Sequence, residues 1–282
     1  MTITVKPEDV TLVIAHGHCA DGMGSMWACK KRLKNVKFWE AFHGDDPPDC
    51  TGEVVALLDF AYKRPVMERI VSQAKGVVVI DHHISAQQDL EGMKNIDLRF
   101  DMDHSGAVLS WQYFHENKPA PILLKYIEDR DLWNWNIEHA REFLTGLDSL
   151  KPSFENYDYA ARYPRKMIAM GIPILAFQKQ IVNDSVKKAC LGTLDGFPAM
   201  IVNENHREFV SDVGNQLAEK HGKIAAMWWL DHETGKISVS LRSTDEIGID
   251  VSEIAANFGG GGHKNASGFG WEGSIEDLFK FE

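Results

Sequence analysis

Short runs of apolar, mostly β-branched residues recur through the first hundred positions of the chain and predict buried strands. The runs cover residues 10–15, 36–42, 54–59, 77–81 and 96–100. Stretches with helical spacing of apolar side chains follow several of them, and they end near residue 33 or cover residues 65–74 and 105–116. Strands that alternate with helices favour a mostly parallel sheet with helices on its faces. We therefore predict an α/β fold.

The second half of the chain predicts a long helix and then a new set of strands. A helix over residues 121–131 and an irregular, aromatic-rich segment over 134–163 precede a long helical pattern over 165–191. Beyond it come strands at 199–202, 225–230 and 236–241 and helices at 207–221 and 250–257. A chain of 282 residues is longer than one core usually needs. We predict two domains, residues 1–185 with a linker helix over 165–192, and a smaller α/β domain over 195–282.

Metal-ligating residue types follow three of the predicted strands and end one of the predicted helices. They are His16 with Asp21, Asp59, the triplet Asp81-His82-His83, and the pair Asp129 and Asp131. The carboxyl ends of parallel strands meet at one edge of a sheet, so these groups are expected to share one cleft. Any single Asp at a turn is ordinary, so the inference depends on the set. Crowded carboxylates raise one another's pKa values, and divalent cations remove that conflict. Mixed Asp and His ligation suits Mn²⁺ best, with Mg²⁺, Co²⁺ or Fe²⁺ as substitutes.

A run of four glycines, residues 259–262, follows the last predicted helix and ends at His263. Consecutive glycines free the backbone to wrap an anion, so this segment is predicted to bind phosphate. A flexible surface loop is the alternative. Arg242, at the end of a predicted strand, is a candidate for the same anion. His104, at the start of a predicted helix, either faces the metal cleft or caps the helix.

Composition narrows the classes of partner. The net charge of −11 argues against broad electrostatic capture of duplex nucleic acid, although it allows a small anionic substrate. The four cysteines form neither a disulfide framework nor a Cys-x-x-Cys zinc site. No apolar run approaches the ~20 residues that span a bilayer, and the first residues lack the features of a secretory signal. We expect a cytoplasmic protein with no membrane partner. Candidates for stacking a nucleobase are Trp133, Trp135, Trp228 and Trp229.

The triplet at residues 81–83, after a buried strand, and the later motif Gly-Gly-Gly-Gly-His-x-x-Ala-x-Gly together resemble the DHH phosphoesterase superfamily. That superfamily includes RecJ exonucleases, nanoRNases, cyclic-dinucleotide phosphodiesterases and exopolyphosphatase-like proteins. The resemblance covers nearly the whole chain and implies a DHH catalytic domain followed by a DHH-associated substrate-binding domain. It also implies two Mn²⁺ ions, held by His16, Asp21, Asp59, His82 and Asp129. Asp59 and Asp129 are the candidates for bridging the two ions.

The resemblance implies further roles, with one departure from the usual pattern. Asp81 either orients the neighbouring histidine or ligates directly. The candidate catalytic or phosphate-binding residues are His83, His104, Arg242, Gly260, Gly261, Gly262 and His263. Cys19 occupies the position of an Asp in the usual first motif, and the histidines there are His16 and His18. One metal position is therefore weaker, uses His18, or recruits Cys19 as a thiolate.

We predict a manganese-dependent phosphoesterase in which an activated water attacks phosphorus in line. The expected substrates are short single-stranded oligonucleotides or small nucleotides such as pGpG, and stable binding of duplex DNA is not expected. A polyphosphatase or phosphomonoesterase would use the same metal site. A non-catalytic nucleotide-binding protein of this fold is a third option, which Cys19 favours. The oligomeric state is left open, a homodimer included.

Overall fold

The computed structural model describes residues 4–42, 44–116, 118–232 and 234–282. The chain forms two compact units, Met1–Leu175 and Ala176–Glu282. The division falls inside the long helix α8 (Pro164–Lys188), which contains Pro173. No helix in the described part of the chain combines the length and apolarity that crossing a bilayer requires.

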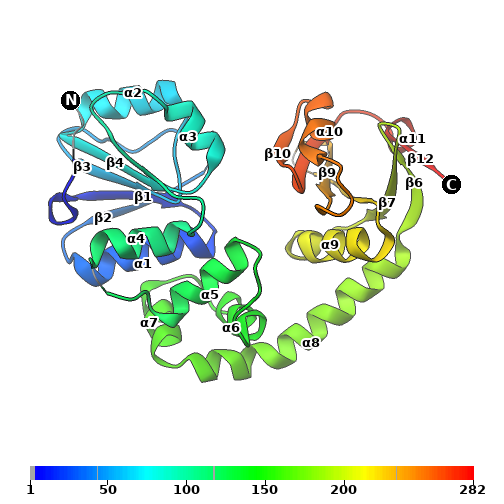
Figure 1. The fold of residues 1–282 in the computed structure, drawn as a ribbon, viewed down its shortest axis with the longest axis horizontal. Helices are drawn as coiled ribbons and strands as arrows, with labels where there is room; N and C mark the ends of the chain where they lie inside the picture. The colour runs from blue at the N-terminus through cyan, green and yellow to red at the C-terminus, as the bar shows by residue number, and fades with distance from the viewer. Residues whose placement is uncertain (1–3, 43, 117, 233) are drawn as a thin grey trace. The chain divides into compact units, whose positions relative to one another are not determined.

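The first unit contains a parallel sheet of five strands in the order β2-β1-β3-β4-β5 (Figure 1). Its strands are β1 (Leu12–His16), β2 (Lys37–Ala41), β3 (Val54–Leu58), β4 (Gly76–Asp81) and β5 (Asp97–Phe100). Every neighbouring pair is parallel, in register Leu12 to Val55 and Val55 to Val77 across the centre. The central strands are buried on both faces, as continuous β-branched runs require.

Helices cover both faces of this sheet because successive strand side chains point to opposite sides. On one face, Val13, Ala56 and Val78 pack against α1 (Ala20–Arg32) and α4 (Gly106–Phe114). On the other face, Ile14, Leu57 and Val79 pack against α2 (Arg64–Gln73) and α3 (Ile84–Leu90). Figure 1 shows these two layers on either side of the strands. The short helix η1 (Pro7–Asp9) precedes β1.

The end of the first unit is helical where the sequence pattern is irregular. It contains α5 (Ile122–Asp131), α6 (Ala140–Asp148) and α7 (Phe154–Arg162), followed by α8. Helices α6 and α8 cross at very close range. A Cβ atom on Gly171 of α8 would lie only 1.7 Å from the Glu142 carbonyl oxygen of α6, so the crossing requires glycine there. Aromatic residues in this region pack into the core on the α1 side of the sheet. Their spacing in the sequence did not predict α6 and α7 as two separate helices.

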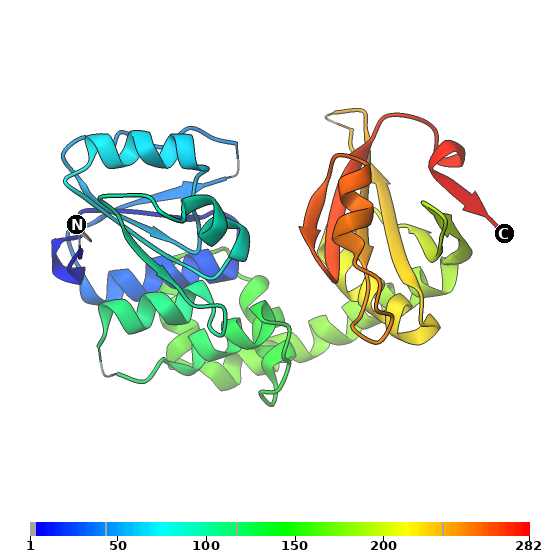
Figure 2. The same ribbon diagram turned by 45° about the horizontal axis from the view of Figure 1, so that its top comes forward.

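The second unit contains a mixed sheet of seven strands in the order β10-β11-β9-β8-β7-β6-β12. The strands are β6 (Cys190–Leu194), β7 (Phe197–Asn203), β8 (Ile224–Leu230), β9 (Ile237–Arg242), β10 (Gly261–His263), β11 (Ala266–Trp271) and β12 (Phe279–Phe281). Only β7 and β8 pair in parallel among them. Its helical segments are η2 (Arg207–Phe209), α9 (Val210–His221), α10 (Val251–Asn257) and α11 (Ile275–Leu278). Helices α9 and α10 cover opposite faces of this sheet (Figure 2). The prediction of an α/β fold with a smaller C-terminal α/β part is confirmed.

Candidate metal centre

Three parallel strands of the first unit end in potential metal ligands at the same edge of the sheet. His16 is the last residue of β1, Asp59 follows β3, and Asp81 is the last residue of β4. Together with nearby side chains they form three overlapping groups, and within each group the ligand atoms all lie within 4.8 Å of one another. The groups are Asp59, Asp81, His82 and His83; His16, Cys19 and Asp59; and Asp21, His82 and Asp131.

His82 lies at the centre of the acidic part of this cluster. Its Nε2 atom is 3.3 Å from Asp59 Oδ1, 3.3 Å from Asp131 Oδ2 and 3.8 Å from Asp21 Oδ2. Two atoms that bind one ion at ~2.1 Å lie about 3.0–3.4 Å apart, so most of these separations match shared coordination. The Asp21 Oδ2 atom is buried and makes no hydrogen bond to the described residues. A buried carboxylate oxygen without a partner is costly, and a divalent cation would satisfy it. These residues therefore fit a metal ion.

Asp59 is shared with a second, softer set of ligand atoms formed with His16 and Cys19. Burial and the nearby Asp21 carboxylate raise the pKa of the Cys19 thiol, so the thiol is neutral unless a cation is bound beside it. His18 is not part of any of the three groups. Its ring instead packs edge-on against Phe42, with ring centroids 5.0 Å apart. His18 and Cys19 were the two candidates to replace the usual Asp as a ligand. The structure brings Cys19 into the cluster and leaves His18 outside it.

The backbone at Asp59 is held in an unusual conformation by its neighbours. Its φ of 52° lies in the left-handed region, which a non-glycine residue occupies at a cost. The Asp59 amide donates a hydrogen bond to the Ile80 carbonyl at 2.9 Å, which ties the end of β3 to β4. A Cβ atom on Gly106 would lie 2.5 Å from Asp59 Cβ and 2.9 Å from Asp21 Oδ2. Gly106 therefore allows the start of α4 to approach the cluster, and the next amide, of Ala107, donates to Asp21 Oδ1 at 2.9 Å.

Gly106 is a residue of the site that was not among the predicted ones. The available signal was Ser105, which caps α4 by accepting a hydrogen bond from the Val108 amide and thereby places a glycine at the first helical position. Without the tertiary structure, nothing shows that this helix start meets two carboxylates from β3 and α1.

Asp81 supports His83 more directly than it supports the His82 ring. Its Oδ1 atom accepts hydrogen bonds from the amides of His82 at 2.7 Å and His83 at 3.3 Å. The same oxygen lies 2.7 Å from His83 Nδ1. This hydrogen bond raises the pKa of His83, which favours the imidazolium form. Asp81 Oδ2 is buried and makes no hydrogen bond among the described residues, so a direct role as a ligand is also open to it.

Asp129, which was predicted as a metal ligand, makes different contacts from its neighbour Asp131, and its ligation of a metal ion stays a prediction. The structure does not bring Asp129 into any of the three groups, and Asp131 lies there instead. The Asp129 carboxylate accepts hydrogen bonds from the Asn136 amide at 2.8 Å and the Ile137 amide at 3.0 Å. It therefore holds the segment after α5, while Asp131 at the helix end reaches His82. Two carboxylates that are two residues apart on a helix face different directions, so only one of them meets the cluster.

The carboxylates of the cluster repel one another in the absence of a cation. Burial, and then the charges of Asp21, Cys19 and Asp131, raise the pKa of Asp59 well above its ordinary value. Burial and the Asp21 charge raise the pKa of Asp131 to about 7. Titratable groups perturbed in this way mark functional sites, and divalent cations would restore the charged forms.

A small pocket of about 90 Å³ adjoins the cluster. His16, Asp59, Asp81 and His83 line one part of it, and side chains that begin α2 and α3, among them Lys63 and Ser85, line the rest. His83 therefore lies at a pocket beside the cluster. His104 is not part of any of the three groups. Its Nδ1 atom lies 3.0 Å from Glu128 Oε2, which also accepts a hydrogen bond from the Ser105 amide. It is fixed between α4 and α5.

The predicted phosphate-binding residues of the second unit lie near one another on neighbouring strands. The glycine run forms a hairpin rather than an open loop, because β10 pairs with β11 from Gly261 opposite Gly268 to His263 opposite Ala266. Ala266 in turn pairs with Arg242 of β9. The Arg242 guanidinium donates to the Ser240 and Ser211 hydroxyl groups and to the Leu241 carbonyl. His263 is exposed.

The glycines of this hairpin serve different purposes. A Cβ atom on Gly260 would lie 2.2 Å from the Gly268 carbonyl oxygen. Gly262 has a φ of 144°, and a Cβ atom on it would lie 2.6 Å from the Ala266 carbonyl oxygen. Packing therefore requires glycine at both positions. Gly261 has no positive φ, and a Cβ atom on it would meet nothing within 4 Å. The fold of this unit does not explain why residue 261 is glycine, whereas close approach of a ligand to the backbone would.

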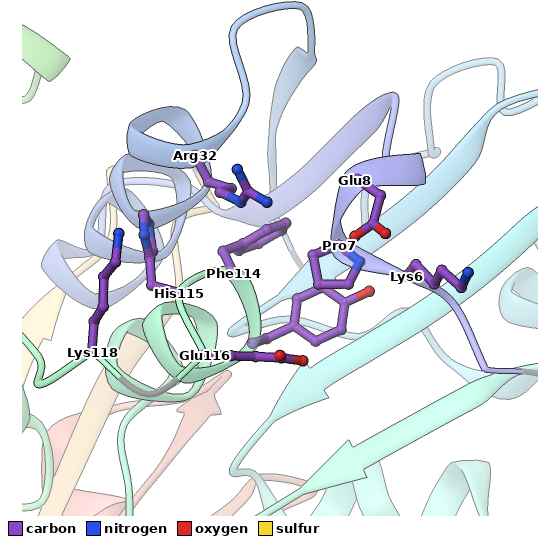
Figure 3. A pocket seen from close by; sticks show the side chains of 9 residues that line it. Lys6, Pro7, Glu8, Arg32, Phe114, His115, Glu116 and Lys118 are labelled. Carbon is purple, nitrogen blue, oxygen red and sulfur yellow. The ribbon is translucent and has the colours of Figure 1, made fainter.

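A larger pocket of about 560 Å³ lies in the first unit beside η1, which precedes β1 (Figure 3). Basic and acidic side chains both line it: Lys6, Glu8, Arg32, Glu116 and Lys118. It also adjoins the last residues of α1 and α4, and the partial negative charge of helix C-termini disfavours anions. None of the three potential metal-binding groups contains any of these residues. The cluster at the carboxyl edge of the sheet is therefore the better candidate for a catalytic site.

Comparisons with known proteins agree with this geometry. The DHHA1 domain family matches residues 198–281. The chain is 30% identical to uncharacterized protein R106 of Acanthamoeba polyphaga mimivirus over 98% of this chain and 70% of that protein. It is also 24% identical to the oligoribonuclease NrnB of Bacillus subtilis (strain 168) over 82% of this chain, and the match spans 62% of the length of NrnB. The chain belongs to the DHH phosphoesterase superfamily.

A solved DHH phosphoesterase shows the same fold. RecJ from Thermus thermophilus, crystallised in complex with Mn²⁺, matches 93% of this chain and 49% of its own length at 13% identity, with a TM-score of 0.55. Membership of the superfamily and the Asp/His cluster together support a metal-dependent hydrolase that acts on phosphoesters.

Proposed function

We propose that this protein is a manganese-dependent phosphodiesterase that hydrolyses short oligonucleotides or dinucleotides. The observation that carries the proposal is the position of His82 Nε2 among the carboxylates of Asp21, Asp59 and Asp131, with Asp59 shared by a second ligand set. Asp/His ligation suits Mn²⁺, and RecJ was crystallised with Mn²⁺.

The proposed ligand sets follow the groups in the structure. Asp21, His82 and Asp131 would hold one ion, while His16 and Cys19 would hold the second. Asp59 contacts both sets and is the proposed bridge. Two ions held in this way would lower the pKa of a water molecule and offset negative charge on the phosphoryl oxygens. The bridge must be rigid for that purpose, and the hydrogen bond of the Asp59 amide to β4 and the packing of α4 against its side chain keep it in place.

His83 is the proposed hydrogen-bond donor to the scissile phosphate. Asp81 orients its ring through Nδ1 and raises its pKa, so Nε2 carries a proton and faces away from Asp81. A charge-assisted hydrogen bond to a phosphate oxygen is stronger than a neutral one and strengthens as charge develops on that oxygen. Asp81 thus fixes both the orientation and the protonation of His83.

The second unit is proposed to bind another phosphate of the substrate. Arg242 and His263 lie on neighbouring strands, and Gly261 leaves the backbone of β10 open to close approach. The substrate is proposed to be short because the chain has a net charge of −11, which weakens binding to long polyanions. The match to the oligoribonuclease NrnB supports the same class of substrate.

The test is a side-by-side hydrolysis panel with the full chain, purified, stripped of metal and supplied with Mn²⁺ or Mg²⁺. The panel contains pGpG, RNA of three to five nucleotides, pAp, a cyclic dinucleotide and polyphosphate. We expect Mn²⁺-dependent release of mononucleotides from pGpG or the short RNA, and loss of this activity in Asp59→Asn. Asp103→Asn, an exposed acid of the same unit, is the matched control and should behave as the wild type. Preferential hydrolysis of polyphosphate, or no hydrolysis at all, would refute the proposal.

A further inference from the structure

An exposed tryptophan closely follows Asp131 in the sequence, in a backbone conformation that a bulky residue rarely adopts. Trp133 is two residues after Asp131, at the end of α5, and it is 42% exposed. Its φ is 56°, in the left-handed region, where a bulky aromatic residue is a clear outlier. Exposure of a large ring and backbone strain both oppose folding. Strain of this kind persists at functional sites because the surrounding structure enforces it.

Asp129 enforces the conformation of this segment. Its carbonyl oxygen accepts hydrogen bonds from the amides of Asn134 and Trp135, while its carboxylate accepts those of Asn136 and Ile137. Four consecutive amides thus converge on one buried residue. The Trp133 amide donates to the Arg130 carbonyl, which closes the turn after α5. The segment is therefore a rigid turn, and the position of Trp133 relative to Asp131 is fixed.

Two further side chains brace the Trp133 ring. Trp135 meets it nearly edge-on, with ring centroids 5.4 Å apart and an interplanar angle of 78°. The Arg141 guanidinium lies 3.8 Å from the centroid of Trp135 and 5.9 Å from that of Trp133. A planar cation beside two indole rings forms a preorganised aromatic surface of the kind on which nucleobases stack.

We propose that Trp133 stacks on a nucleobase of the substrate whose phosphate is bound at the metal cluster that contains Asp131. The proposal rests on the proposed phosphodiesterase function and adds the feature that makes the substrate a nucleotide rather than an inorganic polyphosphate. Stacking uses the face of a base and no hydrogen-bonding edge, so the surface accepts purines and pyrimidines alike. Asp129 is a positioning residue for Trp133 in this account.

The experiment measures selectivity for a base. The full chain with Mn²⁺ is given pGpG or a 5′-phosphorylated dinucleotide in which abasic tetrahydrofuran units replace both nucleosides. The ratio of the two kcat/KM values is compared in wild type, Trp133→Ala, Trp133→Gly and Trp133→Phe. Trp39→Ala removes a tryptophan that is 45% exposed on the edge strand β2 and serves as the matched control.

We expect the ratio to fall about tenfold or more in Trp133→Ala and Trp133→Gly, mainly through KM. Trp133→Phe should keep most of the ratio, and Trp39→Ala all of it. Trp133→Gly separates stacking from folding, because glycine tolerates the left-handed backbone and should unfold at the same temperature as the wild type or a higher one. An unchanged ratio in Trp133→Ala, or an equal loss on both substrates, would overturn the proposal.

Failure of the proposed function gives a different result. In that case the wild type hydrolyses neither substrate, and binding decides the role of the ring. Quenching of tryptophan fluorescence by GMP, measured against ribose 5-phosphate, should then be present in the wild type and Trp39→Phe and lost in Trp133→Phe. Equal quenching in Trp133→Phe and the wild type would show that no base stacks there.

Discussion

Asp129 and Asp131 lie two residues apart, and the structure predicts opposite effects when each is replaced. Asp131 carries a raised pKa of about 7 because its carboxyl group is desolvated and lies close to the charge of Asp21. The ordinary value is near 4, so the metal-free folded state loses stability as the pH rises from about 4 to about 7. Asp129 instead stabilises the fold, because its carboxylate accepts two backbone hydrogen bonds.

The magnitudes follow from these contacts. A shift from about 4 to about 7 corresponds to about 4 kcal/mol, and solvent screening of a side chain that is 26% exposed reduces this to about 1–3 kcal/mol. In EDTA at pH 8, the free energy of unfolding of Asp131→Asn should therefore be about 1–3 kcal/mol higher than that of the wild type. This difference in stability should be smaller at pH 5. Asp129→Ala should lose about 2 kcal/mol at both pH values, because two amides lose a charged acceptor.

Urea unfolding of the metal-free proteins at pH 5 and pH 8, repeated with Mn²⁺, measures both effects. Mn²⁺ at 100 times its dissociation constant should stabilise the wild type by about 2.7 kcal/mol. Asp131→Asn should lose most of that gain, while Asp129→Ala should keep it. The reasoning is wrong if Asp131→Asn is no more stable than the wild type at pH 8, or if Mn²⁺ stabilises it as much as the wild type.

Four further substitutions test the geometry of the site. Gly106→Ala places a Cβ atom 2.5 Å from that of Asp59. The Mn²⁺ affinity measured by calorimetry should therefore fall, and the free energy of unfolding should decrease by about 1–3 kcal/mol. An unchanged affinity would contradict the close approach of α4 to Asp59. Gly261→Ala should keep the melting temperature of the wild type and raise KM for pGpG, whereas Gly262→Ala should lower the melting temperature. Equal melting temperatures of the two variants would contradict the different roles of these glycines. Cys19→Asp should shift the ratio of Mn²⁺ to Co²⁺ affinity on the order of tenfold toward Mn²⁺. It should also abolish any thiolate-to-cobalt absorption band of the Co²⁺-loaded protein. A band that persists in the variant would exclude Cys19 as a ligand.

The parallel sheet and its edge could be predicted because they depend on local patterns. Continuous apolar runs such as residues 77–81 specify strands buried on both faces, and a parallel arrangement places all their carboxyl ends together. That reasoning predicted that Asp59 and the residues after β4 would approach each other, and the structure places Asp59 Oδ1 3.3 Å from His82 Nε2.

The remainder depends on contacts between segments far apart in the sequence. Whether Asp129 or Asp131 faces the cluster depends on how the segment after α5 folds back onto Asp129, which no local pattern specifies. Gly106 matters only because α4 meets β3 and α1. A flexible loop was the alternative for the glycine run, but Gly261–His263 pair with β11 as a strand.

The central claim is that the cluster around Asp59 and His82 hydrolyses phosphodiesters when it holds divalent cations. The most direct measurement is the release of GMP from pGpG by the full chain, first in EDTA and then after addition of Mn²⁺, beside Asp59→Asn. The account predicts no release in EDTA, release on addition of Mn²⁺, and a rate at least about 100-fold lower in Asp59→Asn. Release that persists in EDTA or in Asp59→Asn at the wild-type rate, or an inactive Mn²⁺-loaded protein, would contradict it.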